Sequence, residues 1–230
     1  QYVCVGWAMT GNEPASGAAS ELTMTVTNHA TLTWLWATNY WLDVTAGAHG
    51  SVNADDGWRS FGATTQLTAT ADQYYHFTNW TGSVASGDNP LDLLMDGPKA
   101  VTANFAADLT ANLTPHWWLA SYGWTTDFEN ASSGDEDEDG AFTWQEWVAL
   151  TDPSDSGDVF RAATDLGEAE GHVVQWVSRA GRSYAVYGWT NLLNNPALVA
   201  DQLVWPQEQY TDTTHNAEAL MLYRVKVVVP

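Results

Sequence analysis

The stretch "LDLLMDGPKAVTANF" (residues 91–105) aligns without a gap on "LTMTVTNHATLTWLW" (residues 22–36). Upstream of each stretch, "YHFTNW" (residues 75–80) has the same aromatic spacing as "YVCVGW" (residues 2–7). The alignment places similar side chains over one another, namely Leu22, Met24 and Val26 over Leu91, Leu93 and Met95, and Leu32, Thr33 and Trp36 over Val101, Thr102 and Phe105. Apolar residues at every second position are typical of half-buried strands, so the chain is predicted to contain an internal β repeat.

Turn residues divide each aligned stretch in two. Residues 28–29 (Asn-His) and 96–97 (Asp-Gly) predict tight turns that would join two strands into a hairpin in each copy. Ahead of the second copy, "WLDVTAGAHGSV" (residues 41–52) and "GATTQLTATAD" (residues 62–72) predict further strands, because apolar and polar residues alternate between Gly, Asn and Asp. The first copy lacks such a front half.

The motifs of the second copy resemble a known family. The "VTAGAHGSV" opening, the F-x-x-W-x-G pattern and the closing "VTANF" are similar to the divergent internalin-type B repeat, over residues 40–107 with a half copy at residues 1–37. The resemblance implies small β-grasp-like modules, which occur in tandem on bacterial surface and secreted proteins as spacers, stalks and assembly units.

The segment "DEDEDGAFTWQE" (residues 135–146) fits the EF-hand loop pattern D-x-[DN]-x-[DN]-G-x5-E at every required position. The predicted calcium ligands, in loop order, are Asp135, Asp137, Asp139, the carbonyl of Ala141, a water held by Thr143, and Glu146. Alternation aims the three aspartates inward, whereas Glu136 and Glu138 are expected to face solvent. We therefore expect calcium as the only cofactor.

A solvated acidic loop is the alternative, because runs of like charge are common in an acidic chain. The flanking helical patterns favour calcium. The surrounding sequence also resembles the single calcium loops of dockerin-like and thrombospondin-type-3-like regions. That resemblance implies a possible second ion at Asp152 or Asp155, against the alternative of ordinary turn chemistry in the Asp-Pro-Ser-Asp sequence.

Short helices are predicted on both sides of this loop. Residues 114–123 have a Thr cap, a Pro at the first helical position and a Gly stop, and residues 143–153 read as a second helix that ends at Pro153. Strand alternation returns in the tail, in residues 159–165, 172–178, 183–189 and 220–229, with a hairpin turn at residues 180–181. The predicted fold is mainly β, with tandem small β-domains joined by a short helical calcium-binding linker. Its expected domains are residues 1–38 (half repeat), 39–107 (full repeat), 108–157 (linker) and 158–230 (C-terminal β-domain).

Composition limits the class of partner. The formal net charge is −21, from 28 Asp and Glu against 7 Lys and Arg, so nucleic acid and anionic membranes would be repelled and cations attracted. No apolar run is long enough for a membrane-spanning helix, and the single cysteine cannot form an intrachain disulfide. No catalytic motif is recognisable, and the six histidines lack metal-ligand spacing. We therefore expect a non-catalytic, extracellular or cell-surface structural protein.

Two rival functions remain open. A cleft with paired carboxylates would indicate an enzyme, and a row of exposed, coplanar indoles would indicate a module that binds polysaccharide. Of the 14 tryptophans, Trp7 and Trp80 occupy core positions of the repeat, and packing or intersubunit contact is the favoured role for a second group: Trp34, Trp36, Trp117, Trp118, Trp144 and Trp147.

The half copy predicts assembly. A sheet without its opening strands would expose an apolar face and an unpaired edge, both of which can bind another chain. We therefore expect a homo-oligomer, in which subunits associate head to tail into a filament and "YRVKVVVP" (residues 223–230) supplies the donor or docking strand. The alternative is that the chain is a trimmed piece of a longer stalk.

Overall fold

The structure is a computed structural model that describes residues 1–167, 171–191, 193–215, 218 and 220–229. The chain divides into two compact units, Gln1–Asp108 and Leu109–Pro230. The fold is mainly β, as the sequence predicts. The strands of the first unit are β1 (Tyr2–Thr10), β2 (Ser16–Gly17), β3 (Thr31–Ala46), β4 (Gly50–Val52), β5 (Gly57–Ser60), β6 (Thr64–Leu67), β7 (Ala69–Ala71), β8 (Tyr75–Gly82), β9 (Leu91–Leu94) and β10 (Lys99–Ala107).

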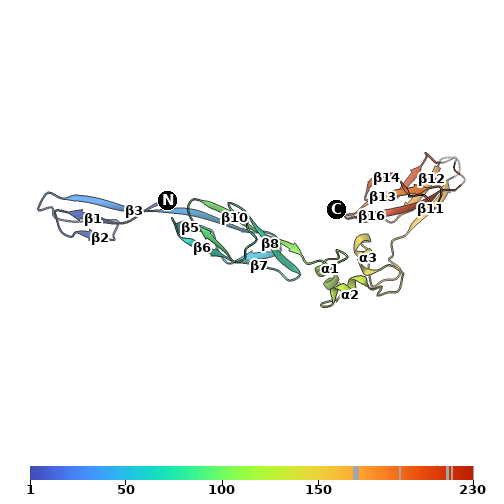
Figure 1. Cartoon of the computed structure of the whole chain (residues 1–230), viewed down its shortest axis with the longest axis horizontal. Helices are drawn as coiled ribbons and strands as arrows, with labels where there is room; N and C mark the ends of the chain where they lie inside the picture. Colours follow the sequence, from blue (N-terminus) through green and yellow to red (C-terminus); the bar gives the residue numbers. More distant parts are fainter. Residues whose placement is uncertain (168–170, 192, 216–217, 219, 230) are drawn as a thin grey trace. The chain divides into compact units, whose positions relative to one another are not determined.

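The first unit is built on one long strand. β3 passes without a break through the expected boundary between residues 38 and 39, and Figure 1 shows it running from the half copy into the full copy. The main sheet has the order β2-β1-β3-β10-β8, with β5 also paired to β3. Two small sheets, β4-β7 and β6-β9, complete the full copy.

The internal repeat is present in the backbone pairing. β1 pairs antiparallel with β3 as β8 pairs with β10, and Trp7 lies opposite Trp34 as Trp80 lies opposite Ala103. Each pair contains a β-bulge at the same place. Val5 of β1 has no partner in β3, and its counterpart, Thr78 of β8, has no partner in β10. The two copies therefore share one register along this pair of strands.

The core of the first unit lies in the full copy. Trp80 and Leu42 are fully buried there. The buried residues of this cluster are Leu42, Leu67, Ala69, Trp80, Leu91, Leu93, Met95, Val101 and Ala103. The half copy buries Trp7 and Met9, and both lie outside this cluster.

The predicted hairpins of the repeat are wrong. β9 and β10 both form in the full copy, but β9 pairs with β6, whereas β10 lies between β8 and β3. In the half copy, residues 22–27 form no strand. The cause is that the strand equivalent to β6 belongs to the front half, which the half copy lacks, and a strand without a partner leaves its backbone groups unpaired.

The second unit begins with three short helices: α1 (His116–Ser121), α2 (Phe128–Ser133) and α3 (Thr143–Ala149). α1 and α3 correspond to the predicted helices, although Pro115 rather than Thr114 is the N-cap of α1. The sequence reading missed α2. Its six residues are too few for an apolar periodicity to be visible.

The tail of the second unit contains two three-stranded sheets. Their strands are β11 (Ala162–Gly167), β12 (Gly171–Trp176), β13 (Ser183–Trp189), β14 (Ala197–Val204), β15 (Gln209–Asp212) and β16 (Leu222–Val228). The sheet orders are β11-β12-β15 and β14-β13-β16. The predicted hairpin at residues 180–181 is therefore wrong, because β12 and β13 belong to different sheets. Their facing side chains, Val174 and Trp176 against Tyr184 and Val186, form one core.

Candidate metal centre

The acidic loop connects the end of α2 to the start of α3. Gly140 has a φ of 95°, a left-handed conformation that glycine adopts without strain, and its amide donates a hydrogen bond to Asp135 Oδ2 at 3.0 Å. This bond closes the turn at the sixth loop position. Glu136 and Glu138 are exposed, in agreement with the prediction that they face solvent.

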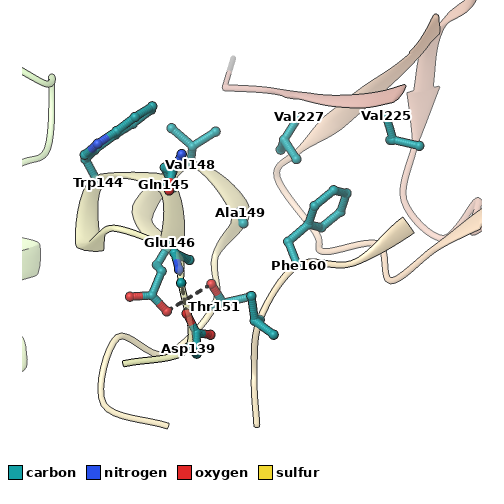
Figure 2. Close-up of a pocket in the computed structure, with 13 residues that line it drawn as sticks. Asp139, Trp144, Gln145, Glu146, Val148, Ala149, Thr151, Phe160, Val225 and Val227 are labelled. Atoms are coloured by element: carbon teal, nitrogen blue, oxygen red, sulfur yellow. Dashed lines mark hydrogen bonds between the residues drawn. The ribbon is translucent and has the colours of Figure 1, made fainter. Parts of the chain in front are cut away.

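Three carboxylates meet inside the loop, and a fourth, that of Glu146, lies near enough to feel their charge. Ligand oxygens of Asp135, Asp137 and Asp139 all lie within 4.8 Å of one another, and they form the one such group of His, Cys, Asp or Glu found among the described residues. Glu146 comes from α3 and is only 1% exposed. Figure 2 shows its carboxylate on the side of α3 that faces the loop carrying Asp139.

One oxygen of each carboxylate is buried without a hydrogen-bond partner in the described part of the chain. These atoms are Asp135 Oδ1, Asp137 Oδ2, Asp139 Oδ2 and Glu146 Oε2. Buried polar atoms are nearly always paired in folded proteins, so four unpaired oxygens in one loop require an explanation. Calcium binds six to eight oxygens, which makes carboxylates the ligands that it prefers.

The second oxygen of each carboxylate is held by the protein. Asp137 Oδ1 accepts from the amide of Asp139 at 3.2 Å, and Asp139 Oδ1 accepts from the amide of Ala141 at 2.7 Å. Thr151 donates its hydroxyl to Glu146 Oε1 at 3.4 Å (Figure 2). One oxygen of each of these carboxylates is thus fixed by the protein, while the other is left for a ligand.

The carboxylates disfavour one another's charge. Burial, followed by the nearby charges of Asp137 and Asp139, raises the pKa of Glu146 from its ordinary value of 4.5 to about 8. Burial also raises the pKa of Asp137, with a further contribution from the charge of Asp139. A bound divalent cation would oppose both effects, because it favours the ionised carboxylates.

The structure brings together the predicted acidic ligands, but it uses Thr143 differently. The Thr143 side chain is buried at the start of α3, and its hydroxyl donates to the Gly134 carbonyl at 3.2 Å. Ala141 occupies the expected seventh position of the loop. Sequence reasoning missed Thr151, which has no signal beyond its place shortly after the loop glutamate.

Arg182 was also missed, although it anchors the helix that carries Glu146. Its guanidinium donates to the carbonyls of Trp147 and Val148 at 2.7 Å each, and it lies 5.1 Å from the Trp147 ring centre. Cations favour the C-terminal ends of helices, where carbonyls lack partners. The residue comes from a distant loop of the tail, so no local pattern identifies it.

Three acidic residues that follow α3, namely Asp152, Asp155 and Asp158, have partners within the protein. Asp152 Oδ1 accepts from the amide and the hydroxyl of Ser154, and Asp155 Oδ1 accepts from the amide of Gly157. Asp158 pairs with Arg179. These contacts fit the alternative of ordinary turn chemistry at Asp152 and Asp155.

An apolar cavity of about 430 Å³ lies beside the metal loop, within the second unit. Figure 2 shows Val148 and Ala149 on α3 facing Phe160, Val225 and Val227 of the tail. The cavity leaves α3 loosely packed on this side. The Arg182 contacts therefore matter for holding the helix in place.

Several indoles are exposed, among them Trp34, Trp36 and Trp117, so burial in a core is not their role and the expected intersubunit contact stays a prediction. The core role of Trp7 and Trp80 is confirmed, since both are buried. Trp41 and Trp58 form an exposed cross-strand pair, but their rings meet at 78° with centres 5.3 Å apart. This pair is therefore not the coplanar row that sugar binding would favour.

Comparison with known proteins identifies one part of the chain. Residues 40–109 match the sequence model of a family described as the divergent InlB B-repeat domain. This range agrees with the resemblance found in residues 40–107, and domains of this family are typical of bacterial surface or secreted proteins. No curated protein and no solved structure showed significant similarity to the chain. Among the described residues, no helix has the length and apolar character needed to cross a membrane.

Proposed function

We propose that this chain is a non-catalytic, calcium-binding structural module of a bacterial surface or secreted protein. The B-repeat domain supports the location, and the metal loop supports the cofactor. The proposed ligands are Asp135, Asp137, Asp139 and Glu146, with the Ala141 carbonyl completing the shell. The role of calcium is to order the segment that joins the B repeat to the tail domain.

The four unpaired buried oxygens carry this proposal. A merely solvated acidic loop would turn its carboxylates toward water, where each oxygen finds a partner at no cost. Here, one oxygen of each carboxylate is directed away from water and toward the others. Like charges in this arrangement repel one another, and a divalent cation converts that repulsion into attraction.

Calcium titration tests the cofactor. We expect the metal-free chain to bind one calcium ion at this loop with a measurable heat in calorimetry. The dissociation constant should lie in the weak extracellular range of about 10⁻⁴ to 10⁻³ M, or somewhat tighter because four carboxylates contribute. The absence of binding heat, together with a melting temperature that calcium leaves unchanged, would contradict the proposal.

The structural role includes association of subunits head to tail. The half copy supports it, because Tyr2, Val5, Val26 and Trp36 are at least half exposed in the single chain. The predicted donor strand needs correction: β16 pairs along its whole length with β13, and residue 230 lies outside the described residues. β16 is an edge strand of its sheet, so it retains only the predicted docking role.

Sedimentation tests the association. We expect the chain to form oligomers whose size grows with concentration, because a head-to-tail contact does not close. Trp36→Ser should lower the oligomer fraction, whereas Trp205→Ser, which removes another exposed indole in the tail, should leave it unchanged. A single monomeric species at all concentrations would exclude the filament while leaving calcium binding intact.

A polysaccharide is the second candidate partner. The exposure of Trp41 and Trp58 favours it, since a free indole face can stack on a sugar ring. The perpendicular arrangement of this pair makes the structural role the better supported one.

A further inference from the structure

Leu22, Met24, Val26 and Trp36 form an apolar face of the half copy, here called the uncovered face. It can be compared with its buried counterpart in the full copy of the same molecule. Leu91, Leu93 and Met95 are buried in the full copy, whereas Leu22 and Met24 are half-buried and Val26 is 62% exposed. Trp36 is 61% exposed, although its counterpart Phe105 packs against the core. The side chains of the half copy are therefore those of a repeat core, but the elements that would bury them are missing.

The front half of the full copy supplies the cover. Residues 42–46 of β3 pair in parallel with β10, with Leu42 opposite Lys99 and Ala46 opposite Ala103. β6 pairs with β9 through Leu67 and Leu91, which creates the strand that the half copy lacks. Gly50 lies so close to Phe105 that an added Cβ would come within 2.3 Å of the ring.

The half copy has no counterpart of these covering strands. By the shared register, the edge equivalent to residues 99–103 of β10 is residues 30–34, most of which belong to β3. In the first unit, which is described throughout, no strand pairs with that edge. Residues 22–25, the counterparts of β9, have no strand partner either.

We propose that the uncovered face of the half copy binds the front half of a B repeat, that is, a segment with the chemistry of residues 40–73. This segment would add a parallel strand along residues 30–34 and would pair residues 22–25 into a strand equivalent to β9. A glycine at the position of Gly50 would receive the Trp36 ring. The inference concerns the same face as the association proposed above, names the segment that would fit its strand edge, and does not depend on calcium.

The partner would be a free front half, one that is not already paired with the strands equivalent to β9 and β10 of its own repeat. The front half in this chain is already bound to β9 and β10, so a second copy can offer it only by uncovering its own core. That exchange buries no additional apolar surface. β16 is engaged with β13 and carries neither the Leu-x-Val spacing of residues 42–44 nor a glycine at the required place.

The connection between the halves defines the experiment. The amide of Asp108 donates to the Tyr74 carbonyl, and in the half copy the amide of Asn39 donates to the Gln1 carbonyl in the same way. Gln1 is thus the counterpart of Tyr74. A copy of residues 40–73 placed directly before Gln1 in the full chain reproduces the connection that the full copy has between Gln73 and Tyr74.

In this extended chain, measured in EDTA, we expect amide exchange of residues 22–25 and of alternate residues in 30–34 to slow by about tenfold or more, because these amides gain hydrogen bonds inside a folded unit. The Trp36 indole should also become less accessible to a fluorescence quencher. The matched control carries Asp at the copied positions of Leu42 and Val44, which keeps length and connection but removes the apolar contacts.

Equal exchange in the extended chain and its control would overturn the proposal. It would also be overturned if association of the unextended chain protected these amides as strongly as the added segment does, because the strand edge would then not require a front half. Calcium binding is not involved in either measurement, so a failed calcium titration cannot imitate these results.

Discussion

Glu146→Gln is expected to weaken calcium binding by about two orders of magnitude or more, while making the metal-free protein more stable. Glu146 is one of the four proposed carboxylate ligands, and its loss lowers the charge that holds the ion. In the metal-free protein, the same charge is buried beside Asp137 and Asp139. Glutamine keeps an oxygen for the Thr151 hydroxyl and places an amide donor where Oε2 has no partner.

Calorimetry and thermal unfolding measure the two effects. The melting temperature without calcium should rise by a few degrees, since 1 kcal/mol corresponds to roughly 4 °C for a unit of this size. Glu136→Gln is the matched control, because it removes an equal charge from the same loop at an exposed position. If the two variants behaved alike, the loop would act as a solvated acidic surface rather than as a metal site.

The pH dependence of the metal-free protein has a definite sign. The pKa of Glu146 is about 8 in the folded chain and near 4.5 when exposed, so the folded state binds more protons between these values. Stability should therefore fall as pH rises from about 4.5 to 8 and should level off above that range. Glu146→Gln should flatten this slope, and saturating calcium should abolish it, because the calcium-bound carboxylate is ionised in the folded state as it is in the unfolded chain over this range.

The sequence predicted the local features of the fold. The gapless alignment of residues 22–36 on 91–105 carried the register of the two strand pairs, because side chains alternate with a fixed period of two. The loop pattern pointed to the three clustered aspartates and to the buried Glu146, since each of these positions depends on local geometry, whereas calcium itself stays a prediction. Local geometry thus determined both of these results.

The missed features depend on contacts between distant segments. The partner of β9 is β6, not the adjacent β10, and a turn at residues 96–97 does not distinguish these possibilities. The tail strands β14 and β15 have little apolar alternation, and the assignment of β12 and β13 to separate sheets follows from the packing of Trp176 on Tyr184. Thr151 acts through one hydrogen bond and Arg182 through two, and such isolated contacts leave no periodic signal.

Trp80→Ala is expected to destabilise the first unit by about 3 to 5 kcal/mol, whereas the equivalent Trp7→Ala should cost roughly half as much. Trp80 is fully buried, donates its Nε1 proton to the Asp88 carbonyl at 2.9 Å and packs on Phe77 with ring centres 5.5 Å apart. Trp7 is buried in the half copy, but its Nε1 has no partner among the described residues. The two positions have the same strand register, so they differ mainly in the cover that the front half provides.

Denaturant unfolding followed by amide exchange in β10 and in the Thr31–Thr38 part of β3 separates the two copies. Trp80→Ala should expose the amides of β10, whereas Trp7→Ala should expose mainly those of the half copy and leave the core around Leu42 intact. The extended chain described above supplies the matched test: with the front half restored, the cost of Trp7→Ala should rise toward that of Trp80→Ala. Equal costs in the unextended chain would mean that the half copy is already as well packed as the full one, and that its exposed face needs no partner.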